Sequence, residues 1–338
     1  MTLIMEVSAQ DRIQESGDSK PYNFSVVPFR IEQHLEFIDI SEDGYLLLGS
    51  SNLVLNYWNG SLWYFKDADL APEKERSLTG HGCDYSIACG KFLDSREKVI
   101  VGDDSGAITV YFITTFENDT IHVIPQMTSL HHDSSITALS VTSSKAQSVS
   151  AGNDLAINIW DNETLVSEFK YMPAHTRTIT CVMTSPEESS SVFASSSLDG
   201  SALLWDRRMN KAACSIKQTQ NYGLTALSWK NSNEIAIGSQ AGNVAVTDIR
   251  AKKDIIAEPV MDCSIHNIIF DNNRGLLGVC GDSTSVKVWD PESKNVVYTD
   301  ERHTGLVRGL AWHPKSQKLY SCGFDKQIFS HQVTTLES

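Results

Sequence analysis

One short pattern returns seven times along this chain of 338 residues. Each copy runs from a tight polar turn into a strand and reaches an aromatic or polar residue, as in Trp160-Asp161 and Trp205-Asp206. The seven copies end at Phe65, Tyr111, Trp160, Trp205, Thr247, Trp289 and His331, in steps of 42 to 49 residues. A repeat of roughly 40–45 residues that ends in Trp-Asp is typical of a four-stranded propeller blade. The sequence therefore predicts an all-β fold, a seven-bladed WD-repeat β-propeller.

The repeat also sets the expected domain boundaries. Residues 1–21 are polar and are predicted to form a disordered tail, residues 22–333 the propeller, and residues 334–338 a C-terminal tail. The last repeat ends too near the C-terminus to hold a full outer strand. We therefore expect Tyr22–Phe29 to supply that strand, which would close the ring and hide an open sheet edge.

Within each repeat the residues indicate an inner strand, a middle strand of small residues, a third strand and a variable outer strand. In the fourth repeat these are predicted at Ile179–Thr184, Val192–Ser196, Ser201–Asp206 and roughly Lys211–Lys217. The inner strand of the first repeat is predicted at Leu35–Ile40. No stretch shows a sustained apolar period of 3.6 residues, so almost no helix is expected.

The charge of the chain bears on its partners. Lys and Arg number 28 against 42 Asp and Glu, a formal net charge of -14. An acidic surface repels phosphate backbones, which disfavours nucleic-acid binding. It would attract a basic partner or basic peptide tails, or it serves only to keep the protein soluble, and both interpretations stay open. No apolar run approaches the roughly 18 residues needed to cross a bilayer, and the first residues lack the pattern of a signal peptide.

A recurrent set of polar residues has two interpretations. His175, Asp199 and Trp205 recur with a serine of Ser195–Ser197 at one period along the chain. Partial copies are His132, Ser150, Asp154 and Trp160, and His303, Ser321 and Asp325. Ser, His and Asp together could perform acyl transfer. A set repeated in several blades is better explained as a structural hydrogen-bond network that holds each turn to its third strand.

Other signatures of catalysis or cofactor binding are missing from the sequence. There is no Gly-rich loop that opens a helix and no His-Glu-x-x-His motif. The seven cysteines form no Cys-x-x-Cys pair, so they are expected to be reduced core residues of an intracellular protein rather than zinc ligands. We therefore assign no catalytic, cofactor-binding or metal-binding residue and predict that the chain is not an enzyme.

One connection departs from the repeat. Between Gly49 and Gly60, where a short polar turn is expected, the chain holds five apolar residues: Leu53, Val54, Leu55, Tyr57 and Trp58. We expect four residues of this connection to form a partner interface: Leu53, Leu55, Tyr57 and Trp58. Leu53 and Leu55 could instead extend the strands as ordinary core residues. Trp58 comes just before the Asn59-Gly60 turn, and an exposed Trp in an apolar loop is a natural anchor for a protein partner. The alternative is that Trp58 folds back over the neighbouring blade.

The same region carries a resemblance to a known family. The segments Asp43–Gly49 and Trp58–Asp67 resemble the WD-repeat subunits of the methylosome (methylosome protein 50). Further similarity lies at Asp104–Ala107, His132-Asp133, Ser191–Phe193, Leu203–Arg208 and Gly323–Gln327 with His331. The similarity extends from about Ile31 to Val333, and the chain departs from the family in its N-terminal tail and over Thr114–Ser129. It therefore resembles a divergent member.

The resemblance implies a function for the chain. It implies a non-catalytic, cytoplasmic and nuclear scaffold subunit of the type II protein arginine methyltransferase, which makes symmetric dimethylarginine. The propeller would bind the N-terminal barrel domain of that enzyme in a hetero-octamer of four plus four chains, and would help present Arg-rich substrates such as histone tails and Sm proteins. By position, Trp58 and Tyr298 match two aromatic contacts of the family.

Two other functions remain to be weighed against this one. The chain could be a generic WD-repeat adaptor of another complex, such as a ubiquitin-ligase substrate receptor or a chromatin complex. It could also be a propeller enzyme, although the missing cofactor and metal motifs disfavour that reading. The Trp58–Asp67 segment favours the methyltransferase subunit over the generic adaptor.

Overall fold

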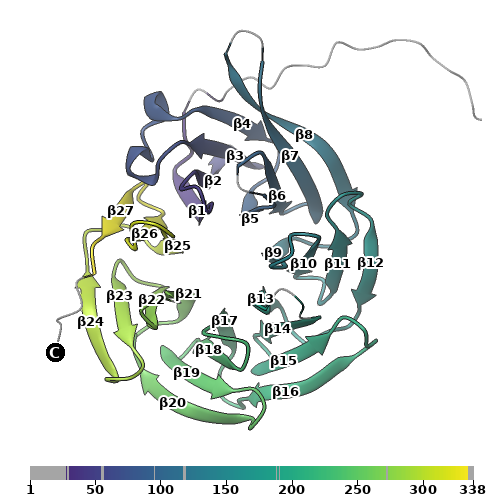
Figure 1. Cartoon of the computed structure of the whole chain (residues 1–338), viewed down its shortest axis with the longest axis vertical. Helices are drawn as coiled ribbons and strands as arrows, with labels where there is room; N and C mark the ends of the chain where they lie inside the picture. The colour runs from purple at the N-terminus through teal and green to yellow at the C-terminus, as the bar shows by residue number, and fades with distance from the viewer. Residues whose placement is uncertain are drawn as a thin grey trace, which may run out of the picture.

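Seven sheets stand around a central axis, and together they form a seven-bladed β-propeller (Figure 1). The computed structural model describes residues 28, 30–54, 57–94, 96–116, 119–187, 189, 191–271 and 273–333. In this part of the chain the only helices are two short 3-10 turns, Ala68–Leu70 and Lys74–Arg76, and neither is long or apolar enough to cross a membrane. The predicted fold class and the near absence of helix are confirmed.

Consecutive strands pair antiparallel within each blade, from the inner strand outward. The first two blades are β1 (His34–Ile40), β2 (Leu46–Val54), β3 (Tyr57–Phe65) and β4 (Thr79–Cys83), then β5 (Ile87–Phe92), β6 (Lys98–Asp103), β7 (Ala107–Thr115) and β8 (Ile121–Leu130). The next two are β9 (Ile136–Val141), β10 (Gln147–Gly152), β11 (Ile157–Asp161) and β12 (Ser167–Tyr171), then β13 (Ile179–Thr184), β14 (Val192–Ser197), β15 (Ser201–Asp206) and β16 (Ala212–Gln218).

The remaining three blades follow the same order. They are β17 (Leu224–Trp229), β18 (Glu234–Ser239), β19 (Asn243–Asp248) and β20 (Lys253–Pro259), then β21 (Ile265–Asp271), β22 (Leu276–Gly281), β23 (Val286–Asp290) and β24 (Asn295–Asp300), then β25 (Val307–Trp312), β26 (Leu319–Gly323) and β27 (Ile328–His331). The predicted strands of the fourth blade agree with β13–β16 to within a residue at nearly every end.

The last blade has three strands in the described part of the chain. The outer strand predicted at Tyr22–Phe29 lies outside the described residues except for Pro28, so ring closure by that segment stays a prediction. Pro28 itself lies beside Gly82 of β4, with its Cγ 3.6 Å from the position that a Cβ on Gly82 would take.

The core is divided into apolar layers between neighbouring blades. One layer joins the first blade to the last: Trp63 and Phe65 pack with Ala311 and Tyr320. β1 also packs against β25 and β26, so residues from the two ends of the chain share one buried interface. None of the seven cysteines, all of which lie in described residues, forms a disulfide. The described blades are therefore joined without disulfides, by apolar layers between neighbouring sheets and by hydrogen bonds.

The recurrent polar residues meet in buried networks. In the fourth blade His175 Nδ1 lies 3.1 Å from Asp199, and its Nε2 lies 2.6 Å from the Ser195 hydroxyl. Trp205 Nε1 donates to the same hydroxyl at 2.8 Å. The third blade repeats this arrangement with His132, Asp154, Ser150 and Trp160. Each network joins the turn before the inner strand to the middle and third strands, so its members hold the blade together.

In the last blade a histidine stands where the other networks have a tryptophan. The Ser321 hydroxyl lies 2.8 Å from the Nε2 atoms of both His303 and His331. A hydroxyl has one proton, so it can donate to only one of the two imidazoles. The other side of the His331 ring faces Asp300, 3.0 Å from Nδ1, and Arg302 forms an ion pair with that carboxylate. Asp325 in turn lies 2.9 Å from His303.

These histidines predict how stability depends on pH. Burial lowers the pKa of His331 to about 4, although Asp300 acts in the opposite direction, and burial also lowers the pKa values of His175 and His303. Between the folded and unfolded pKa values the unfolded chain binds more protons, so stability is lost as the pH falls from about 6.5 toward 4. His331 alone contributes up to about 3 kcal/mol to this loss.

The measurement is urea unfolding at a series of pH values for wild type and His331→Gln, which keeps a donor but cannot titrate. We expect the variant to lose less stability than wild type between pH 6.5 and 4. Exposed His131→Gln is the matched control and should follow wild type. Equal pH slopes for wild type and His331→Gln would show that His331 does not carry the effect.

Candidate partner-binding surface

The β2–β3 hairpin of the first blade is longer than the corresponding hairpin of other blades. Its strands have nine residues each, whereas β14 and β15 of the fourth blade have six. Trp58 pairs with Leu53, and Tyr57 with Val54, so the extra residues continue the ladder instead of forming a loop. The prediction placed Trp58 near a loop tip, and the structure places it inside β3. Leu55, also predicted at the interface, lies outside the described residues.

Three large side chains at the end of this hairpin are exposed to solvent. The exposed fractions are 49% for Leu53, 78% for Tyr57 and 45% for Trp58. By contrast, Trp63 in the same strand is fully buried and donates its indole N–H to Ser61. Apolar surface gathered at one place and left in water is typical of a site that another protein covers.

The ring of Trp58 is supported on one side. Its centroid lies 5.8 Å from that of His34, the first residue of β1. The His34 ring in turn lies edge-on to Phe324, with 4.8 Å between the ring centroids. The guanidinium of Arg308 lies over the ring of Phe324, with its Cζ 5.4 Å from the ring centroid, within the distance at which a cation is attracted to an aromatic ring. Trp58 is therefore oriented by a row of rings that continues into the last blade, while much of its surface stays free.

Of the further exposed residues on this face, two lie near the hairpin in the structure, and the repeat pattern did not indicate either. Tyr85, 52% exposed, follows β4, and its carbonyl lies directly beside Gly60 of the hairpin. Leu306, 38% exposed, precedes β25, and its carbonyl accepts the N–H of Phe324. We call the face that carries Leu53, Tyr57, Trp58, Tyr85 and Leu306 the hairpin face. The repeat predicts that outer-to-inner connections reach this face, but not which of their side chains are exposed.

Tyr298 has a different environment from the hairpin. It lies in β24 of the sixth blade, with the whole last blade between it and the hairpin. Its hydroxyl donates to Asp300 at 2.9 Å, and its ring lies 5.7 Å from that of His331. The side chain is half-buried, and burial raises its pKa. Tyr298 thus takes part in the polar network of the last blade, and the structure does not bring it to Trp58.

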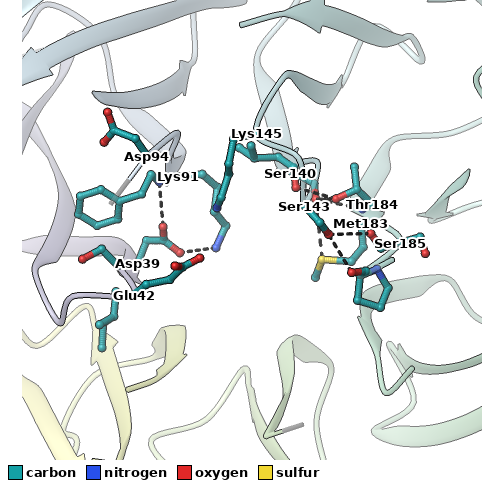
Figure 2. Close-up of a pocket in the computed structure, with 15 residues that line it drawn as sticks. Asp39, Glu42, Lys91, Asp94, Ser140, Ser143, Lys145, Met183, Thr184 and Ser185 are labelled. Carbon is teal, nitrogen blue, oxygen red and sulfur yellow. Dashed lines mark hydrogen bonds and ion pairs between the residues drawn. The ribbon is translucent and has the colours of Figure 1, made fainter. Parts of the chain in front are cut away.

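The far face of the propeller holds a cavity of about 300 Å³ at the ends of the first four inner strands (Figure 2). Lys91 Nζ lies 2.6 Å from Asp39, which also accepts the N–H of Phe92. Across the cavity the hydroxyls of Ser140 and Thr184 are 3.0 Å apart. These groups join the first blade to the second and the third to the fourth, so their hydrogen-bonding capacity is used between blades.

The fold and its polar networks define a WD-repeat β-propeller with an aromatic hairpin exposed on one face. Residues 167–319 match the model for nucleolar protein 10-like proteins, N-terminal domain, a β-propeller family. Methylosome protein WDR77 of Xenopus laevis is 27% identical over 90% of this chain and 91% of its own length, which confirms the predicted resemblance. APC/C activator protein CDC20 of Saccharomyces cerevisiae is 22% identical over 56% of this chain and 32% of its own length.

Exposure of Trp58 predicts that the folded state tolerates its loss. Trp58→Ala should lower the free energy of unfolding by about 1–2 kcal/mol, because only part of the side chain is buried in the folded chain. Trp63→Ala, in the same strand but fully buried, should cost about 3–5 kcal/mol. Thermal and urea unfolding of the two variants make the comparison. If Trp58→Ala unfolds as early as Trp63→Ala, then Trp58 is a core residue and not a binding anchor.

Proposed function

We propose that this chain is a non-catalytic scaffold subunit of a protein arginine methyltransferase complex. Similarity to a methylosome protein along nearly the whole of both chains supports this assignment. The observation that carries it is the exposed hairpin, because Leu53, Tyr57 and Trp58 offer a compact apolar anchor on a rigid blade. Rigid aromatic anchors lose little conformational entropy when they dock.

The finer parts of the proposal follow from the same resemblance. The hairpin face would dock on the N-terminal barrel domain of an enzyme that makes symmetric dimethylarginine, in an assembly of four enzyme and four propeller chains. The complex would act in the cytoplasm and nucleus. The net charge of -14 supports a second role, since an acidic surface concentrates Arg-rich substrates such as histone tails and Sm proteins near the enzyme.

Affinity purification of the tagged chain from native extract tests the proposal most simply. An arginine methyltransferase recovered in stoichiometric amount is the expected result. Recovery of a different assembly, with no methyltransferase, would support the generic WD-repeat adaptor instead.

Docking should depend on Trp58. The exposed part of its side chain is about 100 Å², given 150–250 Å² for a whole aromatic residue, and its burial is worth about 2–3 kcal/mol. Trp58→Ala should therefore weaken binding to the enzyme's N-terminal domain by roughly 30- to 150-fold. Calorimetric titration with the folded variant measures this change.

Met209→Ala is the matched control for that titration. Met209 is 40% exposed in the turn between β15 and β16, at the far face. It should leave affinity within about twofold of wild type, as expected for a residue outside the interface. Tyr298, proposed as a second and weaker contact, is tested by Tyr298→Phe, which keeps the ring. Equal weakening by Trp58→Ala and Met209→Ala would contradict docking at the hairpin.

Catalysis should reside in the partner alone. The purified chain is expected to transfer no methyl group from S-adenosylmethionine to Arg-rich peptides, and to raise the rate of such transfer when added to the methyltransferase. Radiolabel transfer assays with each protein separately and with the mixture give the three rates. Transfer that persists after every trace of co-purified enzyme is removed would show that the chain is itself catalytic.

A further inference from the structure

A polar pocket of about 280 Å³ borders the exposed hairpin. It is lined by Arg30, Ile31, Gln33, Asn52, Asp325 and Lys326. Asn52 lies in β2 one residue before Leu53 and pairs with Asn59, next to Trp58. Asp325 and Lys326 belong to the turn between β26 and β27. The pocket therefore lies between the first and last blades, directly beside the apolar tip of the hairpin.

Two cations line this pocket, and neither has an ion-pair partner in the described part of the chain. Arg30 and Lys326 form no ion pair and no side-chain hydrogen bond with another described residue. Several other cations of the chain have such partners, for example Arg302 with Asp300 and Arg208 with Asp206. Two cations that pair with no described residue share one pocket, in a protein whose net charge is -14.

The only carboxylate in the lining is already occupied. Asp325 lies 2.9 Å from His303 Nδ1 and accepts the backbone N–H groups of Thr304 at 2.8 Å and Gln327 at 3.1 Å. Only 3% of its side chain is exposed. It therefore offers little to a second cation, and the described lining residues together carry a formal charge of about +1 in their standard ionisation states.

We propose that this pocket is an oxyanion subsite, which takes a carboxylate side chain of the protein that docks on the hairpin face; this inference rests on the proposed function. A guanidinium, an ammonium and the amide groups of Gln33 and Asn52 supply the donors that recognise a carboxylate. An apolar anchor with a polar site at its rim is the usual anatomy of a specific interface.

The subsite would fix the orientation of the partner. Burial of Trp58 and Tyr57 alone fits many apolar surfaces, because the hydrophobic effect has no direction. A carboxylate that must meet Arg30 and Lys326 allows only a partner that carries an acidic residue beside its apolar contact. Charge pairs at a rim mainly set the association rate and the choice of partner. The expected partner surface is therefore apolar at its centre with an Asp or Glu at one edge.

The first test uses charge-neutral variants. Arg30→Gln with Lys326→Gln should weaken docking of the methyltransferase N-terminal domain by about tenfold and make it less sensitive to salt. Lys252→Gln with Lys294→Gln is the matched control, because these exposed lysines share the left-handed backbone of Lys326 (φ 52°, 60° and 61°). It should change affinity less than about twofold. Equal effects of the two pairs would overturn the subsite.

The second test needs no protein partner. In protein labelled with 5-fluorotryptophan, the Trp58 fluorine signal is assigned with Trp58→Phe and followed during titration with acetate, inorganic phosphate or chloride at equal ionic strength. A saturable shift with acetate, lost in the Arg30→Gln and Lys326→Gln variant, is expected. A response no larger than that to chloride would overturn the subsite, and a response to phosphate alone would replace the carboxylate by a phosphorylated residue. If acetate shifts the Trp58 signal but no methyltransferase binds the chain, the proposed function is wrong and the anion subsite is still supported.

Discussion

In the third and fourth blades a buried serine hydroxyl lies at the centre of a hydrogen-bond network that joins three parts of the blade. Ser150 and Ser195 each accept an indole N–H from the third strand and meet a histidine from the turn before the inner strand. These groups are buried, so loss of one partner leaves the others unsatisfied at a cost of about 1–3 kcal/mol. In these blades the networks therefore fix the turns of one face to the strands beneath them.

The first blade departs from this arrangement, and the proposed binding surface lies there. Its serine, Ser50, bonds to the hydroxyl of Ser61 at 2.8 Å, and the indole of Trp63 donates to Ser61. The strands then continue past this point and carry Leu53, Tyr57 and Trp58 into solvent. A rigid base with an exposed aromatic end suits a scaffold, because the anchor is already in place before the partner arrives.

The sequence predicted the parts of this structure that depend on local pattern. The repeat period gave seven blades, and alternation within the fourth repeat gave β13–β15 almost to the residue. What it missed depends on ring closure: His34 meets Phe324, and Arg30 shares a pocket with Lys326, although nearly 300 residues separate each pair. Nor does the local pattern show that Tyr298 joins the polar network of Asp300 and His331 in the last blade.

Hydrogen–deuterium exchange of the assembled complex tests the central claim most directly, because it locates the covered surface without a substitution. In the free chain, backbone amides at the exposed end of the hairpin exchange when the strands open locally. A partner that covers this end should hinder the opening and slow the exchange. The account predicts slower exchange at residues 50–61, 84–86 and 304–308 on binding the methyltransferase, with no change at the far-face turns 41–45 and 142–146. Protection confined to the far face or to the outer strands would contradict docking at the hairpin.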